Sequence, residues 1–190
     1  MTKPLRLTSC IASAALLGGT AYADAYTIDA RHTFPSFEVS HLGFSIQRGR
    51  FNKTTGHIDL DPQAKKGRID ITIDANSIDT GLEELEARLK KDDFFHTDKY
   101  PSIRFESARI NFQGDQPVSA DGELTLLGVA RPVHLTIDHF RCGIHPLTLR
   151  YLCGANASAT IERSQFGLTA FAPAVSDEVQ IRIQVEAFKD

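Results

Sequence analysis

Strict alternation of polar and apolar residues is the feature that most constrains how this chain can fold. It runs without a break through residues 68–74, 133–138 and 179–186. Because successive side chains of a strand point to opposite faces, each segment would bury one face and expose the other. Two-faced strands favour antiparallel pairing. The pattern therefore predicts a mainly all-β protein, folded as a sandwich or a barrel.

Weaker segments with the same period lie between these three. Turn-forming pairs such as Asp61-Pro62, Asp121-Gly122 and Leu127-Gly128 separate them. No internal repeat or linker interrupts the series, so residues 24–190 are expected to form one domain. The weaker segments are residues 25–30, 37–42, 46–51, 56–61, 103–112, 123–127 and 157–163.

One stretch has helical rather than strand periodicity. Thr80 and Glu83 have the spacing of a capping box. Leu82, Leu85 and Leu89 then fall on one apolar stripe. We expect a single amphipathic helix over residues 81–91, and its stripe must cover apolar surface. In a small barrel, the open end is the natural place for it.

The first 23 residues have the features of a cleavable secretory signal peptide. Lys3 and Arg6 precede a mostly apolar stretch at 7–17, and Ala21-Tyr22-Ala23 has small residues where a signal peptidase reads them. The alternative of a membrane anchor is disfavoured because residues 18–20 shorten the apolar run. Cleavage near Ala23 would export the remaining chain.

Charge and hydropathy exclude two classes of partner. The chain has 21 Lys and Arg against 24 Asp and Glu, a net charge of −3, so no basic excess attracts phosphates. Nucleic acid is not an expected partner. A membrane helix needs about 18 or more consecutive apolar residues. The exported part has no such run, so we expect no membrane span there.

Two cysteines remain after the predicted cleavage. Cys142 and Cys153 form an even pair in an exported chain, which favours a disulfide. The competing interpretation is a metal site that adds His139 and His145 to the two thiols. That spacing matches no established zinc motif, so we expect a disulfide and no metal.

The sequence gives no sign of catalysis. The motifs of serine hydrolases, nucleotide-binding loops, metalloproteases and dinucleotide-binding folds do not occur. We therefore expect a protein that is not an enzyme and has no catalytic residues. The Asp92-Asp93 pair is interpreted as a solvated helix end.

Phenylalanine is the residue type that stands out, with 12 Phe and no Trp. Phe is usually buried in a core, but a barrel of about eight strands either fills its interior or holds one small ligand. Both outcomes stay open from composition alone. Phe37, Val39 and His41 share one strand face, so His41 is either a buried structural histidine or a ligand contact.

Several motifs in order along the chain resemble the YceI-like family. The match runs from about Tyr26 to Phe188. Its motifs are residues 36–45 with 49–51, then 77–81, 93–95, 99–101, 105–107, 122–133 and 161–168.

The helix departs from the family pattern. Relatives commonly carry Arg-Asp, one residue, then His-Leu, where this chain has Leu85-Glu86-Ala87-Arg88-Leu89. Arg88 therefore replaces the usual His and Leu85 the usual Arg. If that His contacts a ligand's polar end in relatives, head-group preference differs here. The cysteine pair resembles one found in a subset of exported members.

The resemblance implies an extended, lipocalin-like antiparallel barrel with an elongated cavity. It implies a periplasmic binding or carrier protein, without a catalytic cofactor, for a long isoprenoid (quinone or polyprenyl type) or a similar amphiphilic lipid. Members are often dimeric, which makes a homodimer a candidate assembly. The expected ligand-binding residues are Phe37, Val39, His41, Phe44, Phe51, Leu85, Arg88, Leu89, Phe94, Phe95, Phe105, Leu124, Leu126 and Phe166.

Two alternatives of other classes remain at this stage. One is an enzyme built on the same barrel and acting on a lipid or small molecule, with His41, Arg88, Asp93 and Arg163 as candidates. The other is an envelope-stress interaction protein whose core is filled by its own side chains.

Overall fold

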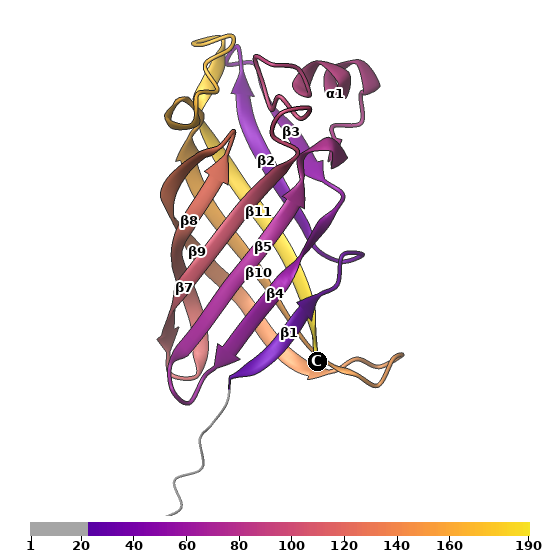
Figure 1. The fold of residues 1–190 in the computed structure, drawn as a ribbon, viewed down its shortest axis with the longest axis vertical. Helices are drawn as coiled ribbons and strands as arrows, with labels where there is room; N and C mark the ends of the chain where they lie inside the picture. Colours follow the sequence, from indigo (N-terminus) through magenta and orange to yellow (C-terminus); the bar gives the residue numbers. More distant parts are fainter. Residues whose placement is uncertain (1–22) are drawn as a thin grey trace, which may run out of the picture.

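The computed structural model describes residues 23–190, which form a tall barrel of antiparallel strands (Figure 1). The predicted signal peptide lies outside the described residues except for Ala23 and stays a prediction. The strands are β1 (Asp24–Ile28), β2 (Phe34–His41), β3 (Ser45–Phe51), β4 (Thr54–Asp61), β5 (Lys66–Asp74), β6 (Ile78–Asp79), β7 (Ser102–Gln113), β8 (Gln116–Leu126), β9 (Val129–Ile144), β10 (Tyr151–Glu162) and β11 (Val175–Lys189).

The sheet closes on itself through β11. The order β1-β4-β5-β7-β8-β9-β10-β11 returns to β1, which gives a closed barrel of eight antiparallel strands. β11 pairs with β1 near its C-terminal end, where Ile28 faces Ala187. It pairs with β2 along its earlier part, from His41 to Phe34. Two consecutive strands therefore share one edge, and the barrel prediction is confirmed over the sandwich.

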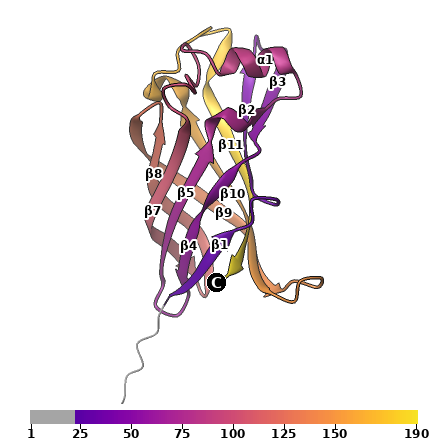
Figure 2. The same cartoon turned by 45° about the vertical axis from the view of Figure 1, so that its right-hand side comes forward.

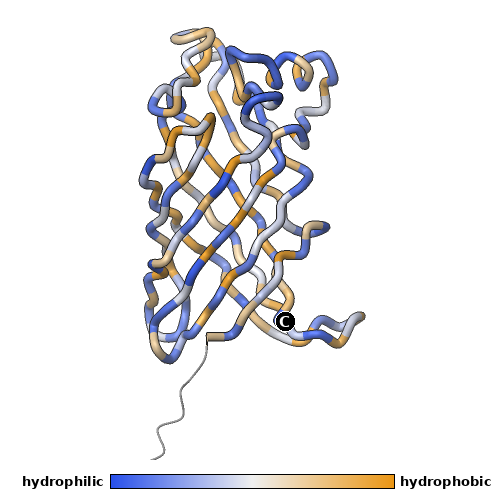
Figure 3. Tube along the Cα trace, viewed as in Figure 1, coloured by the Kyte–Doolittle hydropathy of each residue, from blue (hydrophilic) through white to orange (hydrophobic). Residues whose placement is uncertain are grey.

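The predicted alternation determines which side chains face the interior. Ile69 and Ile73 of β5 are buried, and Ile71 packs against the same core. The residues between them lie on the other face of the strand. Figure 3 shows this as apolar and polar colours that change along the strands.

The single helix of residues 23–190, α1 (Glu83–Leu89), lies at the end of the barrel where β2 turns into β3 (Figures 1 and 2). The predicted single helix is confirmed. It is shorter than the expected range 81–91, and the capping box of Thr80 with Glu83 does not form. Gly81 has a φ of +78°, so the chain turns there and the helix begins later. The Thr80 N–H instead donates to the Glu86 carboxylate at 2.9 Å. Leu82, at 53% exposure, lies outside the half-buried stripe of Leu85 and Leu89.

Two short 3₁₀ turns complete the fold in the described range. The 3₁₀ turns η1 (Ala75–Ser77) and η2 (Arg163–Phe166) follow β5 and β10. No helix within residues 23–190 has the length and hydropathy needed to cross a membrane.

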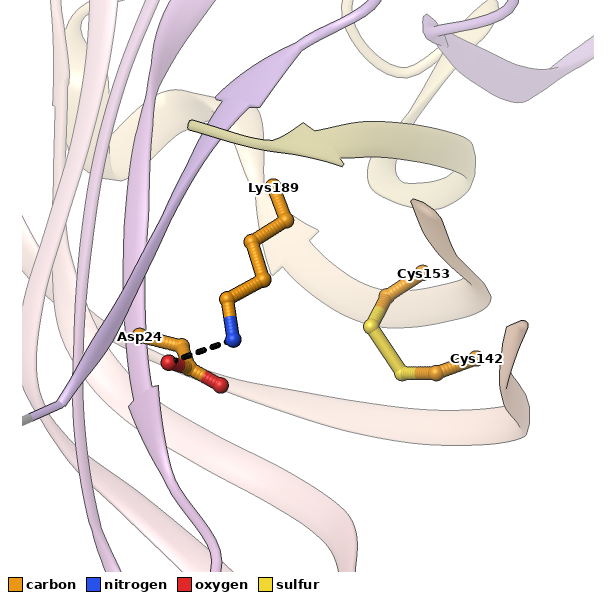
Figure 4. The surroundings of a disulfide bond; sticks show 4 residues. All are labelled: Asp24, Cys142, Cys153 and Lys189. Atoms are coloured by element: carbon orange, nitrogen blue, oxygen red, sulfur yellow. Dashed lines mark ion pairs between the residues drawn. A yellow bond between two sulfur atoms is a disulfide. The ribbon is translucent and has the colours of Figure 1, made fainter. Parts of the chain in front are cut away.

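Cys142 and Cys153 form a disulfide between β9 and β10 (Figure 4). The two residues face each other directly in the strand register, with their Cα atoms 4.0 Å apart. The predicted pairing is therefore present, and the metal alternative is wrong because each sulfur is bonded to the other. Nearby, Lys189 Nζ lies 2.7 Å from an Asp24 carboxylate oxygen and joins the ends of β11 and β1 (Figure 4).

Asp29 anchors the chain where β11 changes its partner from β1 to β2. Its N–H donates to the Glu186 carbonyl at 2.8 Å, and its carboxylate pairs with His32 Nδ1 at 2.9 Å and accepts the Arg31 N–H at 3.0 Å. Burial by itself would raise the pKa of Asp29. The hydrogen bonds from His32 and Arg31 outweigh it and lower that pKa from 3.8 to about 2. The ionised carboxylate is thus favoured by the folded state.

The substitution Asp29→Asn is expected to lower the free energy of unfolding by about 1–2 kcal/mol near neutral pH. The folded-state pKa is depressed, so the wild-type advantage is fully present above pH 3.8 and disappears as pH falls towards 2. Urea unfolding of both proteins across this range measures it, with the exposed Asp138→Asn as control. A stability difference that does not shrink with falling pH would contradict this account.

Candidate functional site

The barrel encloses an elongated cavity of about 790 Å³. Its lining runs from Tyr26 and Cys153, near the end of the barrel that carries the C-terminus, to α1 at the opposite end. At the α1 end, Leu42 and Phe171 both line the cavity and are more than half exposed, so the cavity opens there. The alternative of a barrel filled by its own side chains is wrong.

The walls come from the inward faces of the strands. All of the predicted ligand-binding residues line the cavity except Phe44 and Phe166. For the residues on strands, parity explains this, because alternate residues of one strand reach the same interior. The others lie in α1 or in the segment that follows it. The predicted residues that line it are Phe37, Val39, His41, Phe51, Leu85, Arg88, Leu89, Phe94, Phe95, Phe105, Leu124 and Leu126.

Phe44 and Phe166 were placed incorrectly for different local reasons. Phe44 follows Leu42 and Gly43, which have φ values of 53° and 73°, so the alternation of β2 does not continue through the turn. Its ring is 91% exposed. Phe166 lies in η2, where the chain has left the strand geometry of β10, and its ring is buried in the core rather than on the cavity wall.

Most of the aliphatic wall was not assigned as lining from the sequence, although the alternation had predicted these residues to be inward. Strand parity tells which side chains point inward. Whether they fill the interior or only line it depends on their summed volume compared with the space inside the barrel. The aliphatic residues include Ile58, Leu60, Ile69, Ile71, Ile73, Ile103, Ile110, Val133, Leu135, Ile137, Ile181, Ile183 and Val185.

Small residues on β10 are the other signal that was missed. Ala155 and Ala157 line one side of the cavity, where larger side chains would occupy the interior. A register shift between Gly154 and Asn156 accompanies them. A strand with small inward residues, opposite strands with large ones, leaves the barrel hollow.

Three phenylalanines from distant segments meet on the cavity wall. Phe37 of β2 lies 6.1 Å from Phe51 of β3, and Phe95 lies 6.3 Å and 5.5 Å from them between ring centroids. We call Phe37, Phe51 and Phe95 the aromatic trio. Phe37 packs over Gly49 of the paired strand. The position suits glycine, because a Cβ there would overlap the Phe37 ring. The trio gives the cavity an aromatic, apolar surface.

Arg88 occupies the open end of the cavity between aromatic rings and a carboxylate. Its guanidinium lies 5.2 Å from the centroid of Phe94 and 5.8 Å from that of Phe171, and these two rings stack at 5.9 Å. Arg88 donates two hydrogen bonds to Asp93, one of them at 2.6 Å. This ion pair holds the pKa of the Asp93 carboxyl below its ordinary value. The open end thus carries a cation, Arg88, whose partner is an exposed carboxylate.

Arg163 is a buried cation on the wall, with 6% exposure. It donates to the main-chain carbonyls of Ser176 and Leu168 at 2.8 Å and of Val175 at 3.0 Å. These bonds hold the segment that carries Phe171 over the opening. Of the residues considered for catalysis, Arg163 therefore acts on the main chain, Arg88 and Asp93 pair with each other, and His41 lies exposed at the rim.

The substitution Arg163→Met is expected to lower the free energy of unfolding by about 3 kcal/mol, because three carbonyls lose a charged donor inside the protein. Thermal and urea unfolding measure the loss. The matched control is Arg182→Met, which removes an exposed arginine from β11. Equal stability of the two variants would show that the carbonyl contacts of Arg163 contribute nothing.

Known proteins resemble this chain in sequence and in fold. A model of the YceI-like domain matches residues 26–187. A UPF0312 protein of Pseudomonas aeruginosa is 35% identical over 196 aligned positions that cover 100% of both chains. The crystal structure of Burkholderia cenocepacia BcnA superposes with a TM-score of 0.71 at 24% identity and covers 84% of this chain and 98% of that one. A polyisoprenoid binding domain from Saccharophagus degradans superposes with a TM-score of 0.66 at 19% identity and covers 88% and 99%. At these identities the two structures show a shared fold.

Proposed function

This chain belongs to the YceI-like family, and from that membership we propose that it is a binding protein that encloses the chain of an apolar or amphiphilic lipid. The observation that carries the proposal is the elongated apolar cavity of about 790 Å³. That volume lies in the upper part of the range of roughly 300–1,000 Å³ for small-molecule sites. A related fold described as a polyisoprenoid binding domain supports a long isoprenoid as the ligand class.

The chemistry of the walls suits such a ligand. Burial of each methylene is worth about 0.8 kcal/mol, so a few isoprene units bind tightly without any directed contact. The aromatic trio and the aliphatic residues offer that burial along most of the barrel. A ligand of this class needs an opening that it can enter without crossing polar surface. The exposed apolar side chains of Leu42 and Phe171 supply one at the α1 end.

Arg88 is the group that would meet a polar head at the opening. It already lies against the faces of Phe94 and Phe171, an arrangement that suits a guanidinium. An anionic or strongly hydrogen-bonding head can take over the donors that Arg88 now directs to Asp93. The arginine in place of the family's usual histidine then favours more negative head groups.

The predicted export supports a periplasmic carrier within this proposal. The predicted signal peptide would deliver the chain to an oxidising compartment, where a disulfide such as Cys142–Cys153 persists. A soluble shell around a lipid tail is what movement of such a molecule through water requires. Fractionation of cells into periplasm and cytoplasm tests the location directly.

Native mass spectrometry of gently purified protein tests the proposed function. We expect a co-bound molecule that is released by organic solvent, and uptake of added polyprenyl alcohol by protein stripped in this way. A chain that is uniformly empty and also refuses added polyprenyl lipid would overturn the proposal.

Blocking the cavity provides the matched mutational test. Ala157→Phe places a ring inside the cavity, whereas Asn156→Phe places the same ring on the exposed face of β10. We expect the first variant to lose at least about tenfold in affinity for a polyprenyl lipid, because the ring takes the ligand's space. The second variant should bind as the wild type does. Competition against a fluorescent apolar probe measures both, and equal affinities would argue against binding inside the barrel.

A further inference from the structure

The large apolar side chains that are exposed within residues 23–190 fall into two groups at opposite ends of the barrel. Four lie on the hairpin between β9 and β10, which projects from the end that carries the C-terminus (Figures 1 and 2). Five lie at the α1 end, and two of these also line the cavity. The hairpin group comprises Ile144, Leu147, Leu149 and Tyr151, and the group at the α1 end comprises Leu42, Phe44, Ile46, Leu82 and Phe171.

Two loops that are distant in the sequence meet at the opening. The N–H of Leu42, in the turn between β2 and β3, donates to the Ala174 carbonyl at 2.6 Å. The Val175 N–H donates to the Phe171 carbonyl at 2.9 Å, so the second loop is also closed by its own main chain. These hydrogen bonds hold an exposed apolar surface in place beside the cavity. We call Leu42, Phe44, Ile46 and Phe171 the apolar rim.

The two segments that form the apolar rim are free of charged residues. Residues 39–47 and 164–176 contain no Asp, Glu, Lys or Arg, although these types make up 24% of the chain, and His41 is their one titratable side chain. Phe44 is 91% exposed and is not part of the cavity wall, so neither core packing nor the cavity accounts for it. A contiguous exposed apolar surface marks a site of contact with another molecule.

We propose that the apolar rim docks onto a lipid bilayer, so that a lipid passes between the membrane and the cavity without crossing water. The choice of a membrane as the partner rests on the proposed function, because a polyprenyl lipid resides in a bilayer. Leu42 and Phe171 are both exposed and part of the cavity wall, which makes the apolar rim continuous with the cavity. The lack of charge suits the hydrocarbon boundary of a bilayer, which charged side chains enter only at high cost.

Docking in this way removes an obstacle that an apolar cavity leaves in place. An isoprenoid chain that leaves a bilayer through water must expose its whole apolar surface, at a cost that grows with every methylene. With the apolar rim seated against the acyl chains, the lipid moves from hydrocarbon directly onto the cavity wall. The same contact withdraws the ring of Phe44 from water, which supplies free energy for the docking itself.

The β9–β10 hairpin is the competing docking surface, and its charges predict a different behaviour. Its exposed leucines lie between Arg141 and Arg150, and residues 139–161 contain no Asp or Glu. Docking through this basic hairpin would depend on anionic lipids and weaken as salt screens the charges. Docking through the uncharged apolar rim depends on burial of apolar surface, so neutral lipids suffice and salt has little effect.

Flotation with vesicles of phosphatidylcholine tests the inference. We expect the wild type to float with these neutral vesicles at low and at high salt. Phe44→Ser should lose about tenfold in partitioning, because one Phe side chain is no longer withdrawn from water. Phe44 lies outside the cavity wall, so this variant should still bind polyprenyl lipid from solution as the wild type does. Competition against a fluorescent apolar probe measures that binding.

The matched control is Leu147→Ser, which removes an apolar side chain of similar exposure, 87%, from the hairpin and should float as the wild type does. Thermal unfolding verifies the fold of both variants. If the wild type takes up polyprenyl lipid but does not float, or floats only with anionic phosphatidylglycerol at low salt, the inference is overturned and the proposed function stands. Equal losses for Phe44→Ser and Leu147→Ser would also overturn it. Flotation that depends on Phe44 in a protein that refuses polyprenyl lipid would overturn the proposed function alone.

Discussion

Closure of the sheet through β11 is the constraint on which the rest of the structure depends. Each interior strand has hydrogen-bonded neighbours on both sides, because β1 and β2 in succession occupy the remaining edge of β11. The main chain is therefore satisfied by the wall itself. A wall that is complete in this way can enclose space without a solidly packed interior, so hollowness and stability are compatible.

The two ends of the barrel have different tasks. At one end the ion pair of Asp24 with Lys189 joins the neighbouring ends of β1 and β11. At the other end the wall gives way to α1, the β2–β3 turn and the segment held by Arg163, and the cavity opens between them. Arg88 and Arg163 line the cavity at this end, while most of the remaining wall is apolar. A ligand with one polar end and a long tail matches this distribution.

The candidate site was predictable to the extent that it follows strand parity. Phe37, Val39 and His41 were assigned to one inward face from their spacing, and that face lines the cavity. The same reasoning failed at Phe44 and Phe166, where a turn and a 3₁₀ segment replace the strand and the period of two no longer applies. The helix start was misjudged for a similar reason, since a left-handed Gly81 separates Thr80 from the first helical turn.

The all-β class, the inward and outward faces and the pairing of the two cysteines could be predicted before the fold was known, because all three follow from local period and residue type. The tertiary structure decided that the barrel is hollow, since this depends on side-chain volumes summed across strands far apart in the chain. It also decided that Phe37, Phe51 and Phe95 meet, and that Arg88 lies between Phe94 and Phe171. Those contacts require the register of the closed sheet, which no single segment encodes.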